Sequence, residues 1–196
     1  MHPSASLTTS GRGGPPLPAP PSSPAPYHPS SLDRFNEAPA HTAETVLIGC
    51  CANRRWAARL AAHRPYPDPD ALLAAADEAS YDLSGSEVAD ALAHEEPSGP
   101  GAGVPPAAQT ALLAAHDTYE GRFGHPFVIC LDAYAPEEHL DQVLAGIRFR
   151  LGNEPDEERA VAADELRRLA RGRLARLVRD SWTRPAPRPA SPSVAV

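Results

Sequence analysis

Runs of alanine, leucine and arginine, broken at short intervals by proline, glycine and aspartate, fill the chain between Pro39 and Trp182. Alanine, leucine and arginine are strong helix formers, whereas runs of β-branched residues, which favour strands, are almost absent from this part. The pattern predicts an all-α fold, in the form of a single-domain helical bundle of about six main helices.

Proline marks the limits of this folded unit. Of the 196 residues 24 are proline, and they crowd into residues 11–30 and again after Trp182. Both segments carry too few apolar side chains to offset the entropy that ordering them would cost. We therefore expect disordered Pro-rich tails at residues 1–31 and 183–196, and a helical domain over residues 32–182.

Capping residues locate several of the helices. Asp68 before Pro69 is typical of a helix start, because the aspartate side chain can accept a hydrogen bond from the first turn. Ser84 and Glu87 have the spacing of a capping box, which opens another helix. The expected helices cover about residues 43–62, 69–76, 88–94, 107–122, 136–151 and 156–182.

The charge and the cysteines exclude several classes of protein. A formal charge of −7 argues against a nucleic-acid binder, and the basic stretch at residues 167–179 is expected to be a solvated helix face. No apolar run approaches the roughly 20 residues that cross a bilayer, and no signal pattern opens the chain, so we expect a cytoplasmic protein without membrane contact. The adjacent Cys50 and Cys51 suggest buried reduced thiols rather than metal ligands, and no metal site is expected.

One arginine of the last expected helix lies in its apolar stripe. At about 100° per residue, with Leu166 at 0°, the stripe is defined by Leu169 at about −60°, Ala170 at about +40° and Leu177 at about +20°. Arg173 falls at about −20°, in the middle of it. A buried guanidinium is costly unless it is paired or meets an anionic ligand. An internal ion pair, with a carboxylate of this helix or another, and an anion-binding site both remain open.

A second unusual segment runs from Tyr119 to Pro126 and leads into the apolar residues 127–131. A glycine-containing turn beside an apolar run can present backbone amides to a small polar ligand. It can equally be a helix C-terminus that leads into the core. The sequence does not separate these two interpretations.

Taken together, these motifs resemble the family of 2-oxo-4-hydroxy-4-carboxy-5-ureidoimidazoline (OHCU) decarboxylases, which complete the conversion of urate to (S)-allantoin. The resemblance extends from Phe35 to about Val178 and includes motifs in both halves. They are Phe35-Asn36, Cys50-Cys51-Ala52-Asn53-Arg54-Arg55-Trp56, Arg64-Pro65-Tyr66, the run from Tyr119 to Cys130, Arg150-Leu151-Gly152-Asn153 with Glu158, Glu165-Leu166 and Gly172-Arg173-Leu174.

The resemblance implies an all-α, usually homodimeric lyase that needs neither cofactor nor metal. By position, Arg173 corresponds to the family's substrate-binding arginine, and Phe127 and Ile129 correspond to the segment that lines the substrate pocket. His94 is the nearest match to the catalytic histidine, which handles the proton. The implied reaction is decarboxylation of OHCU to (S)-allantoin in purine degradation.

This sequence departs from the family pattern around His94. The family has a His-Pro pair here, yet an ungapped alignment places Glu95 at the position of the catalytic histidine. The family's later Glu-Gln pair has no visible counterpart, and Gln109 is only a weak substitute. A catalytically degenerate paralogue that acts as a helical binding or assembly module is therefore the alternative. An adaptor whose Pro-rich tails dock on SH3-like domains is a third hypothesis.

Overall fold

The computed structural model describes residues 29–100 and 104–179, which form α-helices and one 3₁₀ turn and contain no strand. The predicted all-α fold is confirmed. Apart from residues 29–31, the predicted tails lie outside the described part. The elements are α1 (Ser31–Glu37), α2 (Ala40–Cys50), α3 (Arg54–Ala62), α4 (Pro69–Tyr81), α5 (Gly85–Leu92), α6 (Pro106–Phe123), η1 (Pro136–Glu138), α7 (His139–Arg150) and α8 (Pro155–Arg179).

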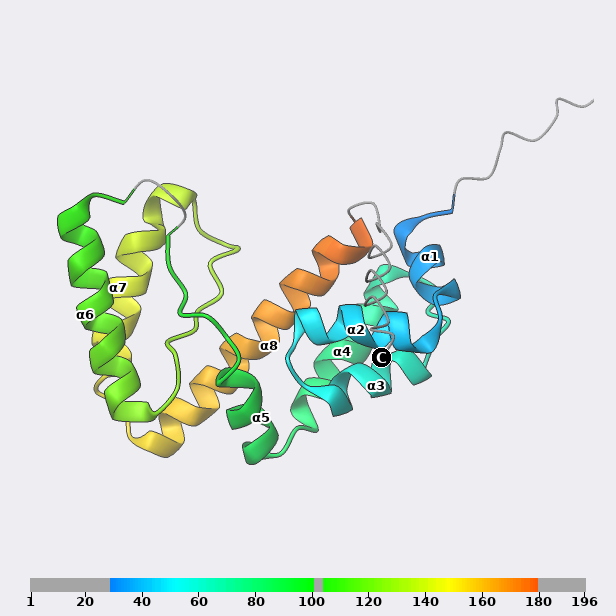
Figure 1. Cartoon of the computed structure of the whole chain (residues 1–196), viewed down its shortest axis with the longest axis horizontal. Coiled ribbons are helices and arrows are strands. Elements are labelled where there is room, and N and C mark those ends of the chain that lie inside the picture. The colour runs from blue at the N-terminus through cyan, green and yellow to red at the C-terminus, as the bar shows by residue number, and fades with distance from the viewer. Residues whose placement is uncertain (1–28, 101–103, 180–196) are drawn as a thin grey trace, which may run out of the picture.

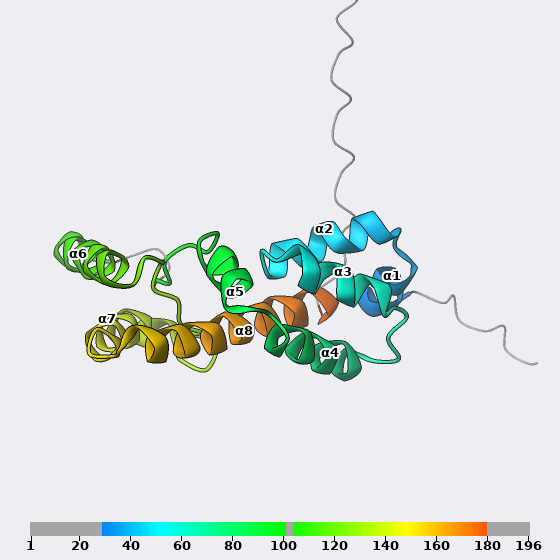
Figure 2. The same cartoon turned by 90° about the horizontal axis from the view of Figure 1, so that it is seen from below.

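Helix α8 is the spine of the molecule. It runs diagonally between two groups of helices, with α1 to α4 around its C-terminal half and α6 and α7 beyond its N-terminal half (Figure 1). The short α5 lies between the groups, and the view from below shows the same order along α8 (Figure 2). Residues far apart in sequence can therefore meet on the surface of this one helix.

The buried face of α8 follows from its sequence. Leu166, Ala170 and Leu174 are almost fully buried at a spacing of four residues, while Leu169 and Leu177 are partly buried against the same core. This spacing keeps one stripe of the helix against its neighbours. The predicted stripe is therefore confirmed at Leu166 and Ala170, but its buried axis follows the i, i+4 row, so Arg173, whose side chain is 34% exposed, lies at the edge of the stripe and not in its middle.

The expected helix over residues 43–62 is in fact two helices, α2 and α3. The side-chain oxygen of Asn53 accepts a hydrogen bond from the backbone amide of Trp56 at 2.9 Å, so Asn53 caps a new helix immediately after Cys51. A second capping box, formed by Ser30 and Asp33, opens the unpredicted α1. A short polar cap such as Asn53 marks a helix start inside alanine-rich sequence, and the helical periodicity on both sides obscured this signal.

The N-terminal motifs hold helices together. Arg64 donates from Nη1 to the backbone carbonyls of Phe35 at 2.6 Å and Ala38 at 2.7 Å, at the end of α1. Asn36 and the backbone of Tyr66 exchange two hydrogen bonds, each of 2.9 Å. These contacts satisfy buried backbone groups between α1 and the segment after α3. We therefore assign the Phe35-Asn36 and Arg64-Pro65-Tyr66 motifs to the scaffold.

The basic stretch at residues 167–179 is paired with carboxylates from Arg167 to Arg176. Arg167 and Arg171 both pair with Asp77 of α4, and Arg176 pairs with Asp132 at 2.9 Å.

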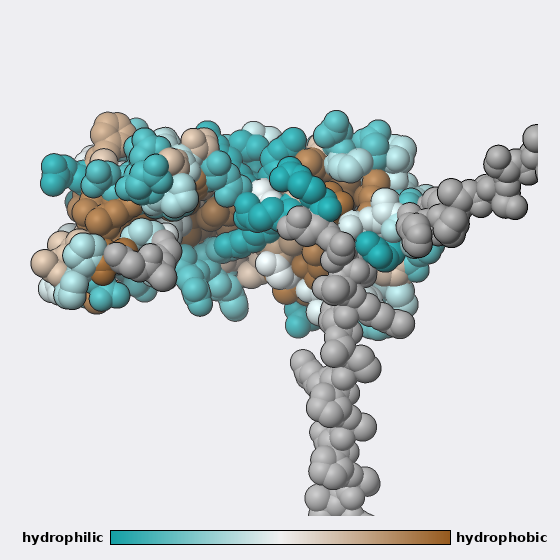
Figure 3. Space-filling view, turned by 90° about the horizontal axis from the view of Figure 1, so that it is seen from above, coloured by the Kyte–Doolittle hydropathy of each residue, from teal (hydrophilic) through white to brown (hydrophobic). Residues whose placement is uncertain are grey.

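Hydrophilic side chains cover the middle of the face shown in Figure 3, and hydrophobic ones gather toward its ends. Among the described helices none is long and apolar enough to span a membrane.

Candidate functional site

The predicted inward arginine, Arg173, meets a carboxylate from another part of the chain. Its Nη1 and Nη2 donate to the two carboxylate oxygens of Glu95 at 2.8 and 2.6 Å, in a bidentate ion pair. The Glu95 side chain is only 5% exposed, whereas that of Arg173 is 34% exposed. Of the two possibilities left open by the sequence, the internal ion pair with a carboxylate outside α8 is the one the structure contains.

The adjacent Cys50 and Cys51 lie beside the ion pair of Arg173 and Glu95. Nη1 of Arg173 also donates to the backbone carbonyl of Cys50 at 3.1 Å, so the guanidinium is held against the end of α2. The described cysteines are free thiols, and Cys50 and Cys51 are buried as expected. Burial raises the pKa of the Cys50 thiol to about 11 and that of Cys51 to about 12, with Glu95 adding to the second shift. Both thiols are therefore protonated at neutral pH, and the hydrogen bond to Glu95 raises the pKa of Arg173 further.

The segment that carries Glu95 also binds the backbone of residues 127–129. The Ser98 amide donates to the carbonyl of Phe127 at 2.9 Å. The Ser98 hydroxyl accepts from the amide of Ile129 at 2.9 Å and lies 3.1 Å from its carbonyl oxygen. Glu95 and Ser98 therefore contact all three positions that the family resemblance assigns to substrate binding.

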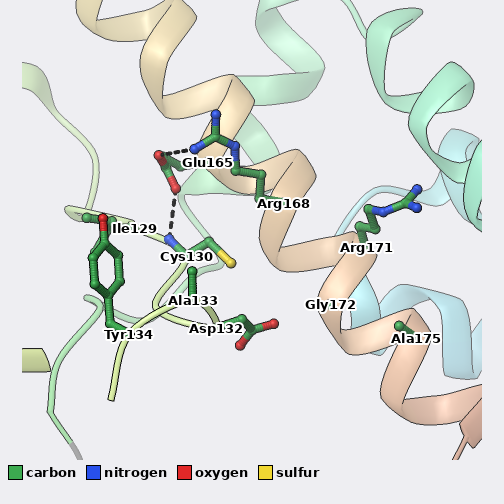
Figure 4. Close-up of a pocket in the computed structure, with 10 residues that line it drawn as sticks. All are labelled: Ile129, Cys130, Asp132, Ala133, Tyr134, Glu165, Arg168, Arg171, Gly172 and Ala175. Carbon is green, nitrogen blue, oxygen red and sulfur yellow. Dashed lines mark hydrogen bonds and ion pairs between the residues drawn. The ribbon is translucent and has the colours of Figure 1, made fainter. Parts of the chain in front are cut away.

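Phe127 and Ile129 differ in their surroundings. The Phe127 ring is fully buried in a cluster with Tyr119, Val143 and Ile147. Ile129 is half-buried and lines a cavity of about 400 Å³ between residues 129–134 and α8. Figure 4 shows Glu165 in this cavity, bonded to the Cys130 amide at 2.8 Å and to Arg168 at 3.2 Å. Arg173 is absent from the cavity lining, so its ion pair with Glu95 is a separate feature.

The segment from Tyr119 to Pro126 is a helix end that leads into the core. Tyr119 is in the last part of α6, and Gly124 terminates this helix in the left-handed conformation, with a φ of 76°. Nε of Arg150 donates to Glu158 at 2.8 Å, and its Nη1 donates to the carbonyl of Val128 at 2.7 Å. The hydroxyl of Tyr119 also bonds to Glu158, whose side chain is fully buried. These residues fix the position of the 127–131 segment from behind.

His94 is exposed at the C-terminal end of α5. Its Nδ1 donates to the backbone carbonyl of Asp90 at 2.7 Å, which leaves Nε2 as the ring nitrogen free to exchange a proton. His63 makes the same contact with the carbonyl of Arg59, also at 2.7 Å, at the end of α3. The contact is thus a form of helix C-capping that occurs twice in this chain. The structure places the residue after His94, and not the His94 ring, on Arg173.

Glu95 and Ser98 are the residues that sequence reasoning did not assign to the site. One signal was available for Glu95, because the ungapped alignment places it at the family's histidine position. Ser98 had no such signal, since a serine in a Gly- and Pro-rich loop is unremarkable. Its role depends on contacts with Ile129, which is 31 positions away in the sequence.

The buried His116 lies next to the segments that carry Ser98 and Phe127. It is 8% exposed, its ring lies 6.2 Å from that of Phe127, and its Nδ1 has no hydrogen-bond partner. Burial lowers the pKa of His116, although a hydrogen bond with the Ser98 backbone and the nearby Asp117 and Glu120 partly oppose this. The folded protein therefore favours the neutral ring.

This burial predicts a loss of stability in mild acid. A folded-state pKa below the usual 6.5 means that the unfolded chain binds the proton more readily. The contribution of neutral His116 is complete above about pH 6.5 and is lost as the pH falls through the lowered value. Urea unfolding from about pH 7 to about pH 5 should therefore show a smaller loss of stability in His116→Gln than in the wild type. Exposed His41→Gln is the control, and equal slopes in all three proteins would contradict the prediction.

No group of three or more His, Cys, Asp or Glu side chains among residues 29–100 and 104–179 has an arrangement that could hold a metal ion. The site described above consists of one guanidinium, one carboxylate, one hydroxyl and backbone groups. Its chemistry is that of hydrogen bonding and charge.

Comparison with solved structures identifies the class of fold. The chain is similar to the crystal structure of an (S)-allantoin synthase, with a TM-score of 0.62 and 17% identity over 76% of this chain and 54% of that one. It is also similar to an OHCU decarboxylase crystallised in the presence of (S)-allantoin, with a TM-score of 0.59 and 20% identity over 68% of this chain and 96% of that one. At these identities the likeness defines a shared all-α fold.

The sequence comparison identifies the family. The model of the OHCU decarboxylase family matches residues 36–97 and 93–175. The chain therefore belongs to the OHCU decarboxylase family. A 2-oxo-4-hydroxy-4-carboxy-5-ureidoimidazoline decarboxylase of Amia calva is 41% identical over 56 residues, which are 29% of this chain and 30% of that protein. The aligned part is thus less than a third of this relative's length.

Proposed function

We propose that this chain decarboxylates OHCU to (S)-allantoin, without a cofactor, as a step of urate degradation. Family membership supports the reaction class, and the Arg173 centre supports the presence of an anion-binding group. A single observation carries the proposal. Arg173, in the Gly172-Arg173-Leu174 motif, lies at the surface of the core, and its guanidinium already binds a carboxylate, that of Glu95, through two hydrogen bonds. A site that binds one carboxylate in this way has the geometry to bind another.

The chemistry of the substrate sets what the protein must do. When the bond to the carboxylate carbon breaks, CO₂ leaves and its electron pair stays on a carbon that is conjugated with neighbouring C=N and C=O groups. That carbanion is stabilised by the substrate itself, and it takes up one proton to give the product. The protein therefore has to hold the anion, orient the ring and deliver the proton to one face.

Each proposed residue has one of these tasks. Arg173 binds the anionic end of the substrate, because a planar guanidinium matches a carboxylate in two parallel hydrogen bonds. Phe127 and Ile129 orient the ring through the backbone of their segment, once Ser98 has released it. His94 delivers the proton from Nε2, since its Nδ1 is engaged by Asp90.

The test is a circular-dichroism assay that follows (S)-allantoin formed from freshly oxidised urate. The wild type should form it faster than the spontaneous reaction, and His94→Ala should lower kcat by about 100-fold or more. His63→Ala is a matched control, because it removes the same helix-end hydrogen bond but no proposed catalytic group. A wild-type rate equal to the spontaneous one, or equal losses in the two variants, would refute the assignment.

One observation favours the alternative, a helical binding or assembly module. Glu95 and Ser98 already occupy the groups that the reaction needs. A chain that never releases them would keep the scaffold and lose the activity. Wild-type protein that is folded yet inactive in the assay above would support this alternative.

We also propose that the chain forms a homodimer. Leu113 of α6 and Phe149 of α7 are 62% and 79% exposed, which is unusual for large apolar side chains on adjacent helices. Light scattering on the full chain should give twice the monomer mass of 20.7 kDa, and a monomer would refute this proposal.

A further inference from the structure

Glu95 holds Arg173 in the way that a bound carboxylate would. Both carboxylate oxygens are used, at 2.8 and 2.6 Å, by two different nitrogens of the guanidinium. This is the bidentate geometry with which arginine binds carboxylate ligands. The contact joins residues 78 positions apart, so it depends on the fold and not on neighbours in one helix.

The pair is asymmetric in a way that permits exchange. The Glu95 side chain is 5% exposed, but about a third of the Arg173 side chain remains accessible. Water or a ligand can therefore reach the guanidinium without unfolding the core. Glu95 itself comes after the end of α5, where its amide donates to the carbonyl of Leu92 at 3.0 Å, and the segment from there to Ser98 is irregular.

A second contact of the same segment occupies neighbouring binding groups. The Ser98 hydroxyl accepts from the Ile129 amide, and the Ser98 amide donates to the carbonyl of Phe127. The segment 95–98 thus presents a carboxylate to Arg173 and a hydroxyl and an amide to the backbone of residues 127–129. These are the kinds of group that a hydroxylated, carboxylated ring with amide nitrogens would present.

We propose that Glu95 is a built-in competitor for the anion subsite at Arg173, and that it determines which ligands this site accepts. A carboxylate ligand must displace Glu95, because two carboxylates on one guanidinium repel each other. A neutral ligand that uses only the backbone groups meets no such repulsion. The inference rests on the proposed function, and it assigns to Glu95 a specificity-determining role within that site.

Two ureido compounds that differ in charge provide the test. Allantoate carries a carboxylate and (S)-allantoin is neutral, and their dissociation constants can be measured by calorimetry on the full chain. Glu95→Gln should tighten the binding of allantoate by about tenfold or more, because the competing charge is gone, and should change the binding of (S)-allantoin by less than about twofold. Exposed Glu96→Gln is the matched control and should change neither.

Three outcomes overturn the inference. They are an allantoate affinity that Glu95→Gln leaves unchanged, a gain that Glu96→Gln reproduces, and a gain that persists when Arg173 is also replaced by glutamine. Kinetics of the Glu95→Gln variant give a second readout. Loss of a competitor should lower the KM for decarboxylation without lowering kcat. A fall in kcat would instead identify Glu95 as a proton-transfer group.

The wild type supplies a measurement that does not depend on a variant folding. With allantoate at ten times its measured dissociation constant, the carboxyl ¹³C resonance of Glu95 should move as the side chain leaves Arg173. An unchanged resonance overturns the inference.

The two proposals can fail separately. If the enzyme is active but Glu95→Gln does not change its affinity for allantoate, only the competitor role of Glu95 is refuted. If the chain is inactive but Glu95→Gln binds allantoate more tightly, only the decarboxylase proposal is refuted.

Discussion

Replacing Glu158 with glutamine is expected to lower the free energy of unfolding by about 3–5 kcal/mol, the largest effect on stability that we predict. The Glu158 side chain is fully buried and accepts hydrogen bonds from Arg150, Tyr119 and Asn153, the last at 2.8 Å. An amide of the same size cannot balance the guanidinium, which is only 6% exposed. The cost is that of leaving a buried charge without its counterion.

A surface pair on the same helix provides the matched control for Glu158. Asp156 accepts from Arg159 at 2.7 Å, but the two side chains are 92% and 54% exposed. Asp156→Asn removes one charge from the first turn of α8, as Glu158→Gln does, and should cost less than about 1 kcal/mol. Urea unfolding monitored by circular dichroism would measure both variants. Similar losses in the two would show that the buried network has no special role.

The helices could be predicted from the sequence wherever their caps were recognised. Asp68 and the box of Ser84 and Glu87 begin helices in the structure as expected. The errors arose where a cap lay inside helix-forming sequence, as Asn53 does, because the alanine-rich periodicity continues on both sides of it. Capping is a local interaction between a side chain and the next turn, and it can therefore be inferred from sequence when it is looked for.

The interpretation of the Tyr119 segment could not be settled from the sequence. Tyr119, Arg150, Asn153 and Glu158 are part of the family resemblance, yet their side chains meet one another and not a cavity. A motif can persist because it lines a site or because it supports one, and the residue types are the same in both cases. Here the network holds the carbonyl of Val128, and so acts on the candidate site through the backbone.

Of the ion pair at the candidate site, only Arg173 could be predicted from the sequence. The 100° periodicity places Arg173 in the apolar stripe of α8, and this requires no knowledge of the rest of the fold. Its partner, Glu95, lies on an irregular segment whose path depends on packing against residues 127–129. Periodicity gives no information about such a segment, so the identity of Glu95 as the carboxylate that pairs with Arg173 came from the three-dimensional structure.

Replacing Arg173 with glutamine is expected to lower kcat/KM for decarboxylation by about 1000-fold, the largest effect on activity that we predict. Glutamine cannot supply the positive charge or the two parallel hydrogen bonds with which Arg173 is proposed to hold the substrate's carboxylate. The same change leaves the buried carboxylate of Glu95 without its counterion, and should also lower the free energy of unfolding by about 1–3 kcal/mol. A loss of activity in this variant alone could therefore reflect a damaged fold.

The double variant Arg173→Gln with Glu95→Gln separates the two causes. Two amides can hydrogen-bond to each other, so most of the lost stability should return, whereas activity should stay as low as in Arg173→Gln because no cation remains. Arg171→Gln, which removes a neighbouring arginine paired with Asp77, should leave kcat/KM within about threefold of the wild type. Activity that returns together with stability would mean that Arg173 serves only the scaffold, because a group that binds the substrate's charge cannot be replaced by restoring the fold around it.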